Sequence, residues 1–219
     1  MDLTPLALSL RVAALATALA IGVGVPLAWL LARKSFPGRD VVSVLVVLPM
    51  VLPPTVLGYG LLVLLGRQGP VDPVIRALFG EGLVFTPAAA VVAAFVAATP
   101  FLVRAAQGGF EQLDVAYEEA ARTLGRREFA VFLTVTAPLA WRGIAAGIAL
   151  CFARAIGEFG ATLMLAGNIP GRTQTASVAI YDAVQAGRIE QATSLALALA
   201  IVAGAALLLL ARVGRGARW

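Results

Sequence analysis

Five long apolar stretches dominate this 219-residue chain and limit what it can fold into; they lie at residues 12–32, 41–65, 88–103, 143–166 and 192–211. A helix of about 20 apolar residues is long enough to cross the hydrocarbon core of a bilayer. The mean hydropathy of +0.92 and the 60% share of hydrophobic residues exceed what a soluble domain needs for its core. The sequence therefore predicts an all-α polytopic membrane protein with five transmembrane helices, forming a single domain over residues 1–219.

The composition excludes several classes of site. The chain has no histidine and one cysteine, Cys151, which lies inside an apolar stretch. This rules out metal sites built on imidazoles or paired thiolates, and Ser-His or Cys-His nucleophile pairs. The single lysine, Lys34, is not preceded by the glycines of a phosphate-binding loop. We therefore expect no catalytic, cofactor-binding or metal-binding residues, and any ATP hydrolysis to occur in a separate subunit.

The basic residues indicate how the chain is oriented. Eleven lysines and arginines lie after the first stretch, after the third and in the C-terminal tail, against four in the other loops. Cytoplasmic loops of membrane proteins carry the excess of lysine and arginine. The sequence therefore predicts an outer N-terminus and a cytoplasmic C-terminus. The high pI of about 10.3 follows from these loop arginines, so no nucleic-acid partner is expected.

Residues 117–128 break the apolar pattern with six charges, in a chain that is only 13% charged. On a helix, Glu118, Arg122 and Arg126 would stack at i, i+4 spacing. Gly125 is suited to end such a helix. By spacing alone the segment fits either a solvated loop whose charges keep it out of the membrane, or a short helix that docks on a soluble partner.

The segment "EAARTLG" followed by "VTAP" resembles the cytoplasmic loop of binding-protein-dependent ABC importer permeases. Val135 and Ala137 stand where that family has isoleucine and leucine. The resemblance implies that residues 111–140 form a coupling loop whose short helix sits in a cleft of an ATPase subunit. The residues that it assigns to this coupling are Glu119, Ala120, Ala121, Gly125 and Pro138.

Charged groups also occur inside the fourth apolar stretch, where Arg154 and Glu158 are four residues apart. Intramembrane charges are costly and usually face protein or a water-filled cavity. The pair is therefore either a structural ion pair that fixes helix packing or part of the transport pathway. Gly143 and Gly147, also four apart, favour close helix packing.

The second apolar stretch contains Pro49, Pro53 and Pro54, so we expect it to be bent and to face protein or a cavity. Thr55 and, in the fourth stretch, Thr162 supply polar groups. The bend can be purely structural or can belong to the pathway. The candidate pathway or gate set is Pro53, Pro54, Thr55, Arg154, Glu158 and Thr162.

Several motifs together, among them "LPMVLPPTVLGYG", "GEFGATLMLAGNIPGRTQT" and "AIYDAVQAG", resemble the molybdate branch of these type I permeases. The resemblance implies import of molybdate, with tungstate as a second substrate, across a bacterial inner membrane from periplasm to cytoplasm. It implies four kinds of partner: a second copy of the chain, ATP-binding cassette ATPase subunits, a periplasmic molybdate-binding protein and the lipid bilayer. "GEFGA" also occurs in sulfate permeases, so a permease for sulfate, thiosulfate or another oxyanion is the alternative. A stand-alone secondary transporter is the alternative from a different class; it would need inverted repeats or many intramembrane charges, and the sequence shows neither.

Overall fold

The structure is a computed structural model that describes residues 2–216, and this part of the chain contains helices, turns and no strand. Arg218, counted above among the cytoplasmic charges, lies outside the described residues. The helices are α1 (Thr4–Arg33), α2 (Arg39–Val51), α3 (Pro54–Leu65), α4 (Asp72–Phe79), α5 (Pro87–Glu111), α6 (Val115–Thr123), α7 (Glu128–Val131), η1 (Phe132–Thr136), α8 (Ala137–Leu139), α9 (Trp141–Ile156), α10 (Gly160–Ala166), α11 (Ala176–Gln185) and α12 (Ile189–Gly216).

Three helices, α1, α5 and α12, are long and apolar enough to cross a membrane, and the number rises to five if each of two bent helix pairs is one span. The all-α membrane fold is thereby confirmed. The third span is longer than its apolar stretch, because α5 continues to Glu111. Hydrogen bonds from Arg104 to Gln107 and from Gln107 to Glu111 connect polar side chains along this added length.

The bend expected in the second apolar stretch is present. The chain bends by 118° between helices α2 and α3. Leu52 and Pro53 adopt extended backbone between them. Each precedes a proline, whose ring disfavours helical backbone in the residue before it.

The expected fourth span, 143–166, is not a single helix. Helix α9 ends at Ile156, and α10 starts only at Gly160. The carboxylate of Glu158 accepts a hydrogen bond from the backbone N–H of Ala161 at 2.8 Å and so satisfies a free donor in the first turn of α10. The bent pair that contains α9 instead joins residues Glu128–Leu139 to it at 77°.

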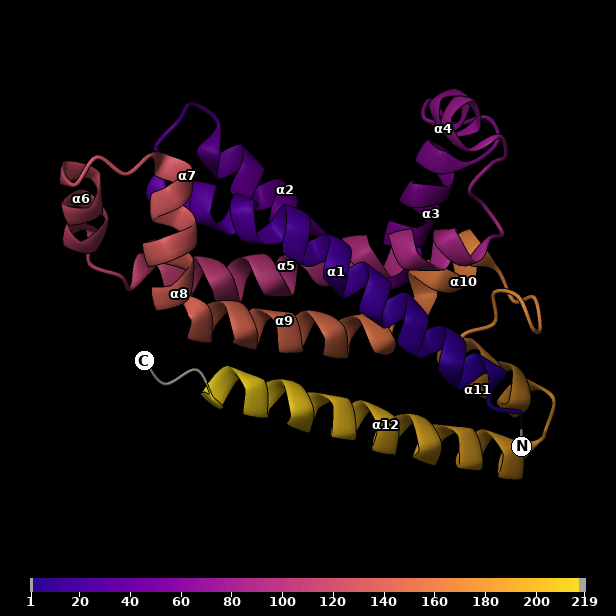
Figure 1. Cartoon of the computed structure of the whole chain (residues 1–219). Coiled ribbons are helices and arrows are strands. Elements are labelled where there is room, and N and C mark those ends of the chain that lie inside the picture. The colour runs from indigo at the N-terminus through magenta and orange to yellow at the C-terminus, as the bar shows by residue number, and fades with distance from the viewer. Residues whose placement is uncertain (1, 217–219) are drawn as a thin grey trace.

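Small residues let the central helices approach closely. Helix α5 packs against both α1 and α9, and α12 lies along α9 (Figure 1). A side chain at Gly143 would lie 2.7 Å from Cα of Gly109, and one at Gly147 would lie 2.9 Å from the carbonyl oxygen of Leu102. The predicted packing role of these two glycines is confirmed. The helix faces that meet are lined with buried alanines: Ala13, Ala16, Ala20, Ala90, Ala93, Ala94, Ala97 and Ala98.

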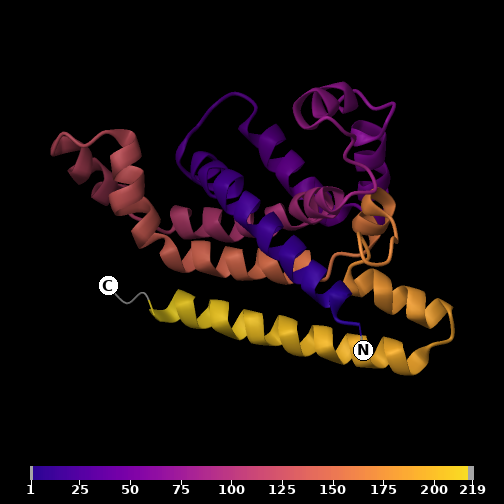
Figure 2. The same cartoon turned by 45° about the vertical axis from the view of Figure 1, so that its right-hand side comes forward.

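The loops segregate to the two ends of the long helices. Figures 1 and 2 show α6 and the C-terminal end of α12 at one end, and α4 and the N-terminus at the opposite end. Ion pairs place the end of α1 beside α6 and α7. The segments that the charge count assigns to one side of the membrane therefore lie at one end of the molecule.

Candidate functional site

Helix α6 is a short, well-delimited element. The Asp114 side chain accepts a hydrogen bond from the backbone N–H of Ala116 at 2.9 Å and caps its first turn. Its end is marked by Gly125, whose φ of +79° is disfavoured for other residues. The predicted helix stop at Gly125 is confirmed. The predicted stack of Glu118, Arg122 and Arg126 is wrong at its last member, because the helix ends at Thr123 before Arg126 is reached.

One face of α6 points away from the rest of the protein. Glu119 and Ala120 are exposed, and Leu124 just beyond the helix is 83% exposed. Ala121 is buried on the opposite face, so the two alanines of the sequence motif do not share a surface. Pro138 lies in the first turn of α8 and is exposed.

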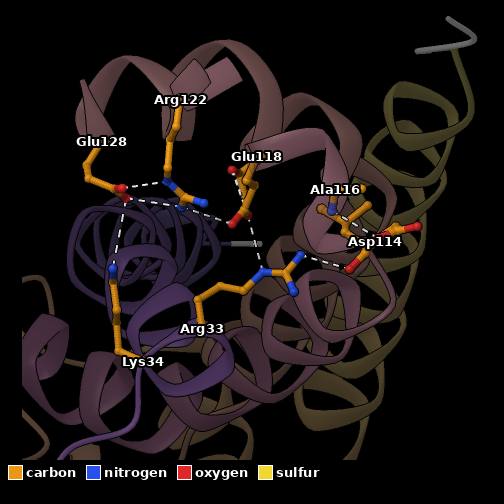
Figure 3. Close-up of polar contacts among 9 residues, drawn as sticks. Arg33, Lys34, Asp114, Ala116, Glu118, Arg122 and Glu128 are labelled. Atoms are coloured by element: carbon orange, nitrogen blue, oxygen red, sulfur yellow. Dashed lines mark hydrogen bonds and ion pairs between the residues drawn. The ribbon is translucent and has the colours of Figure 1, made fainter. Parts of the chain in front are cut away.

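The opposite face of α6 carries a charge, Glu118, whose burial the sequence pattern did not predict. Glu118 is only 3% exposed. Its carboxylate lies 3.2 Å from Nε of Arg33, at the end of α1, and accepts a hydrogen bond from the hydroxyl of Thr136 at 2.9 Å. Arg33 also donates to the carbonyl oxygen of Leu113 at 2.9 Å. Figure 3 shows Arg33 below α6, with its guanidinium beside Glu118.

A second, more exposed set of ion pairs lies beside this one (Figure 3). Arg122 donates to Glu128 at 2.6 Å and lies 3.4 Å from Glu118. Glu128 is 3.9 Å from Nζ of Lys34. The hydrogen bond to Glu128 is the main cause that raises the pKa of Arg122. Glu118, Arg122 and Glu128 are therefore paired with one another and with the end of α1.

The candidate pathway residues form two groups that meet where α3 and α10 begin. Pro53, Pro54 and Thr55 are exposed in the single chain. A side chain at Gly160 would lie 2.8 Å from Cβ of Pro54, so the start of α10 touches the start of α3. Thr162 is fully buried within the chain.

The predicted proximity of Arg154 and Glu158 is confirmed as an ion pair. The Arg154 side chain remains partly exposed, at 28%, whereas Glu158 is buried and also caps α10. Glu158 therefore has a structural role in the single chain.

A cavity of about 600 Å³ lies in the loop region at the end of the molecule opposite to α6. Its lining includes Arg67, Arg76, Arg172, Asp72 and Glu81. Arg76 is paired with Asp72 at 2.7 Å. Within residues 2–216, no group of three or more Asp, Glu, Cys or His side chains is arranged to hold a metal ion.

The model of the family described as binding-protein-dependent transport system inner membrane component matches residues 24–215. The chain belongs to this family. It is therefore a multi-pass component of an inner membrane and a subunit of a transport system.

Among curated relatives of this family member, the molybdenum transport system permease protein ModB of Haemophilus influenzae is 40% identical over 92% of this chain and 88% of its own length. The protein of the same name from Escherichia coli K12 is 45% identical over 81% of this chain and 78% of its own. A putative molybdenum transport system permease of Bacillus subtilis, YvgM, is 41% identical over 84% and 81%.

Two solved ABC transporters share the fold of this chain. A bacterial alginate importer matches with a TM-score of 0.76 and 16% identity over 97% of this chain and 78% of the other. The methionine transporter MetNI matches with a TM-score of 0.72 and 18% identity over 98% and 95%. At these identities the likeness concerns the fold.

Proposed function

We propose that this chain is the permease subunit of an ATP-driven importer that moves molybdate from the periplasm to the cytoplasm. The support for the substrate is that relatives with 40–45% identity over most of the chain are named molybdenum transport permeases. The support for ATP-driven import is the family membership together with the outward face of α6. The chain forms one transmembrane domain over residues 1–219, with residues 111–140 as its coupling loop.

The working assembly contains two copies of this chain, two ATPase subunits and one periplasmic binding protein. A single copy leaves large apolar surfaces uncovered: in the most apolar stretch of α12, only 6% of the residues are buried. Val44 and Leu45 of α2 are also largely exposed, at 63% and 59%. In the membrane such faces contact either lipid or another transmembrane subunit. A related solved alginate transporter is described in complex with a periplasmic protein.

Coupling to the ATPase takes place at the exposed face of α6. Glu119 and Ala120 form that face, while Ala121 and Gly125 set the position and the end of the helix. Pro138 starts the segment that returns to the membrane. The observation that carries this proposal is the contrast between two adjacent glutamates: Glu118 is buried and paired within the chain, whereas Glu119 is exposed. Glu119 therefore remains available for an arginine of the ATPase.

Docking is tested by co-purification of the ATPase with Glu119→Ala and Gly125→Asp. Loss of one charged hydrogen bond costs about 1.5–3 kcal/mol, which weakens docking about ten- to a hundred-fold. Gly125→Asp introduces a side chain at a φ of +79° and misdirects the helix end, so its effect should be at least as large. Glu190→Ala is the matched control, since Glu190 is an exposed glutamate in the first turn of α12 at the other end of the molecule. If both test variants bind the ATPase as the wild type does, α6 is only a solvated segment that keeps the loop out of the membrane.

The orientation that we propose has the N-terminus in the periplasm and the end with α6 in the cytoplasm. This follows from the excess of arginine and lysine in the loops at that end. The pathway then runs between two copies of the chain, past the bend of α2 and α3 and the break before α10. Its candidate residues are Pro53, Pro54, Thr55, Arg154, Glu158 and Thr162.

The substrate is tested in proteoliposomes that contain the complete transporter and its binding protein. Uptake and stimulated ATP hydrolysis are measured with molybdate, tungstate and sulfate. We expect molybdate to be transported in an ATP-dependent manner, with tungstate as a competitor. Preferential uptake of sulfate would assign the chain to another oxyanion, and uptake by the chain alone without ATP would make it a secondary transporter.

A further inference from the structure

The coupling helix α6 is held to the membrane-embedded part of its own chain by one buried ion pair. The Arg33 side chain at the end of α1 is 10% exposed and that of Glu118 is 4% exposed, with 3.2 Å between Nε and the carboxylate oxygen. Removal of Glu118 leaves the buried Arg33 guanidinium without a carboxylate, which is strongly destabilising. Removal of Arg33 leaves Glu118 with Arg122 as its remaining partner, at 3.4 Å. By contrast, the neighbouring Lys34 side chain is 46% exposed and lies 3.9 Å from its partner Glu128.

The remaining contacts of the pair extend to the segment on each side of α6. Arg33 donates to the carbonyl oxygen of Leu113, just before the helix, at 2.9 Å. Glu118 accepts from the hydroxyl of Thr136, which ends η1 after the helix, at 2.9 Å. The two side chains therefore join the entry to α6, the helix itself and the chain that leaves it (Figure 3).

An aromatic contact joins the same parts of the chain. Phe132, the first residue of η1, lies with its ring centroid 5.6 Å from that of Trp29 in α1 and 6.2 Å from that of Phe110 in α5. Pairs at these separations are favourable. η1 is a π-helix, a wider turn that recurs at functional sites. The aromatic contact joins this irregular segment to α1, and the hydrogen bond from Thr136 joins it to Glu118 of α6.

The far end of this connection is the transmembrane core. Helix α1 packs along α5 and also contacts α9. A displacement of α6 is therefore transmitted through α1 to the helices that surround the proposed transport pathway. The contact between Arg33 and Glu118 is the polar contact that connects α6 to α1.

We propose that Arg33 and Glu118 form a tie that transmits movement of the coupling helix into α1, and that this tie is required for coupling ATP hydrolysis to transport. The proposal rests on the proposed docking of α6 on an ATPase. Both residues are positioning residues, since neither touches ATP or the transported anion. Glu118 and Glu119 then have separate tasks: Glu118 holds the helix to its own chain, and Glu119 holds it to the partner.

The test uses the complete transporter with its binding protein in proteoliposomes and measures molybdate uptake per ATP hydrolysed. Arg33→Ala and Glu118→Gln each remove the ion pair. Glu118→Gln keeps an oxygen that accepts the Thr136 hydroxyl, so folding is least disturbed in this variant. The pair is then rebuilt with reversed charges in the double variant Arg33→Glu/Glu118→Lys, in which Arg122 retains Glu128 as its partner at 2.6 Å. Lys34→Ala is the matched control in the next position of the chain.

We expect each single variant to keep its ATPase subunits and to hydrolyse ATP, while uptake per ATP falls about tenfold. The reversed pair should recover most of this loss, and Lys34→Ala should stay within about twofold of the wild type. Unchanged uptake per ATP in both single variants would overturn the proposal. The proposal would also be overturned if the reversed pair did no better than Arg33→Glu and Glu118→Lys taken singly. This holds even where those single variants fail to assemble, because the reversed pair must then restore assembly.

Failure of this tie is distinguishable from failure of the docking proposal. If α6 does not dock on the ATPase, Glu119→Ala keeps both ATPase binding and uptake. If α6 docks but the tie is unimportant, Glu119→Ala loses ATPase binding while Arg33→Ala and Glu118→Gln transport normally.

Discussion

The crossing of α5 and α9 permits a graded test of how closely these helices pack. A methyl group added at Gly143 would lie 2.7 Å from Cα of Gly109 and 3.0 Å from the carbonyl oxygen of Ala105. One added at Gly109 would lie 3.0 Å from Cα of Gly143. One added at Gly108, the adjacent residue of the same helix, meets no atom within 4 Å. The expected order of stability is therefore Gly108→Ala, then Gly109→Ala, then Gly143→Ala.

The size of the effect follows from these distances. Carbon atoms pack best at about 3.5–4.0 Å, so Gly143→Ala forces the two backbones apart by about 1 Å. Overpacking of this kind costs about 1–3 kcal/mol. All three substitutions also gain about 1 kcal/mol of helix propensity, which cancels when the variants are compared with each other. We expect Gly143→Ala to be about 2 kcal/mol less stable than Gly108→Ala, a difference of about 4–8 °C in Tm for a chain of this size.

The chain contains its own reporter for this assay. Cys151 is the one cysteine of the sequence and is fully buried in α9. A maleimide dye that fluoresces on reaction with a thiol will therefore label the purified permease in detergent only when the packing around α9 opens. The temperature of half-maximal labelling is measured for the wild type and the three alanine variants. Equal midpoints for all three, or the lowest midpoint for Gly108→Ala, would refute the close backbone contact.

Three further predictions follow from the loops and the candidate pathway. A reporter fused after Gly125 should signal the cytoplasm and one fused after Gly80 the periplasm; the reverse pattern would overturn the proposed orientation. Thr55→Cys should react with a water-soluble maleimide, because Thr55 is exposed and borders the proposed pathway, while Thr162→Cys should not react in this conformation, because Thr162 is fully buried. Glu158→Ala should lower stability by about 1–3 kcal/mol, since it leaves the partly exposed Arg154 and a backbone N–H in the first turn of α10 without their acceptor. Glu158→Gln, which keeps an acceptor oxygen, should lose clearly less in the same thermal assay, and equal losses would argue against the capping role.

The sequence predicted those features of the fold that depend on length and on individual backbone preferences. Long apolar runs mark membrane helices strongly, and Pro53 and Pro54 mark the bend between α2 and α3 because of their fixed ring geometry. Gly125 marked the end of α6 for the corresponding reason. In each case the signal is local, so one sequence is sufficient to detect it.

The break between α9 and α10 is marked less clearly: Gly157 and Gly160 on either side of Glu158 favour a bend or a close backbone approach, but they do not fix where the helix ends. Apolar residues continue through the region, and Gly157 is tolerated within a membrane helix. The helix ends because the Glu158 carboxylate caps the next one and because the start of α10 lies directly against Pro54. The cap is local, because it joins residues three positions apart, whereas the contact with Pro54 is tertiary. Thr162 was predicted to border the pathway for its polarity alone, and its burial within the chain likewise depends on how α10 packs.

The two faces of α6 show why the sequence identified its outer contact and missed its inner one. Neighbouring residues on a helix point about 100° apart, whereas residues three or four positions apart share a face. Glu118, Ala121 and Arg122 accordingly lie on the inner face, and Glu119 and Ala120 lie on the outer one. Nothing in the sequence distinguishes the first glutamate from the second, because their assignment depends on how α6 is rotated about its axis. That rotation is set by Arg33, more than 80 positions earlier in the chain, whose guanidinium is close enough to reach only the first of them. The buried pair therefore determines which glutamate is left free for a partner.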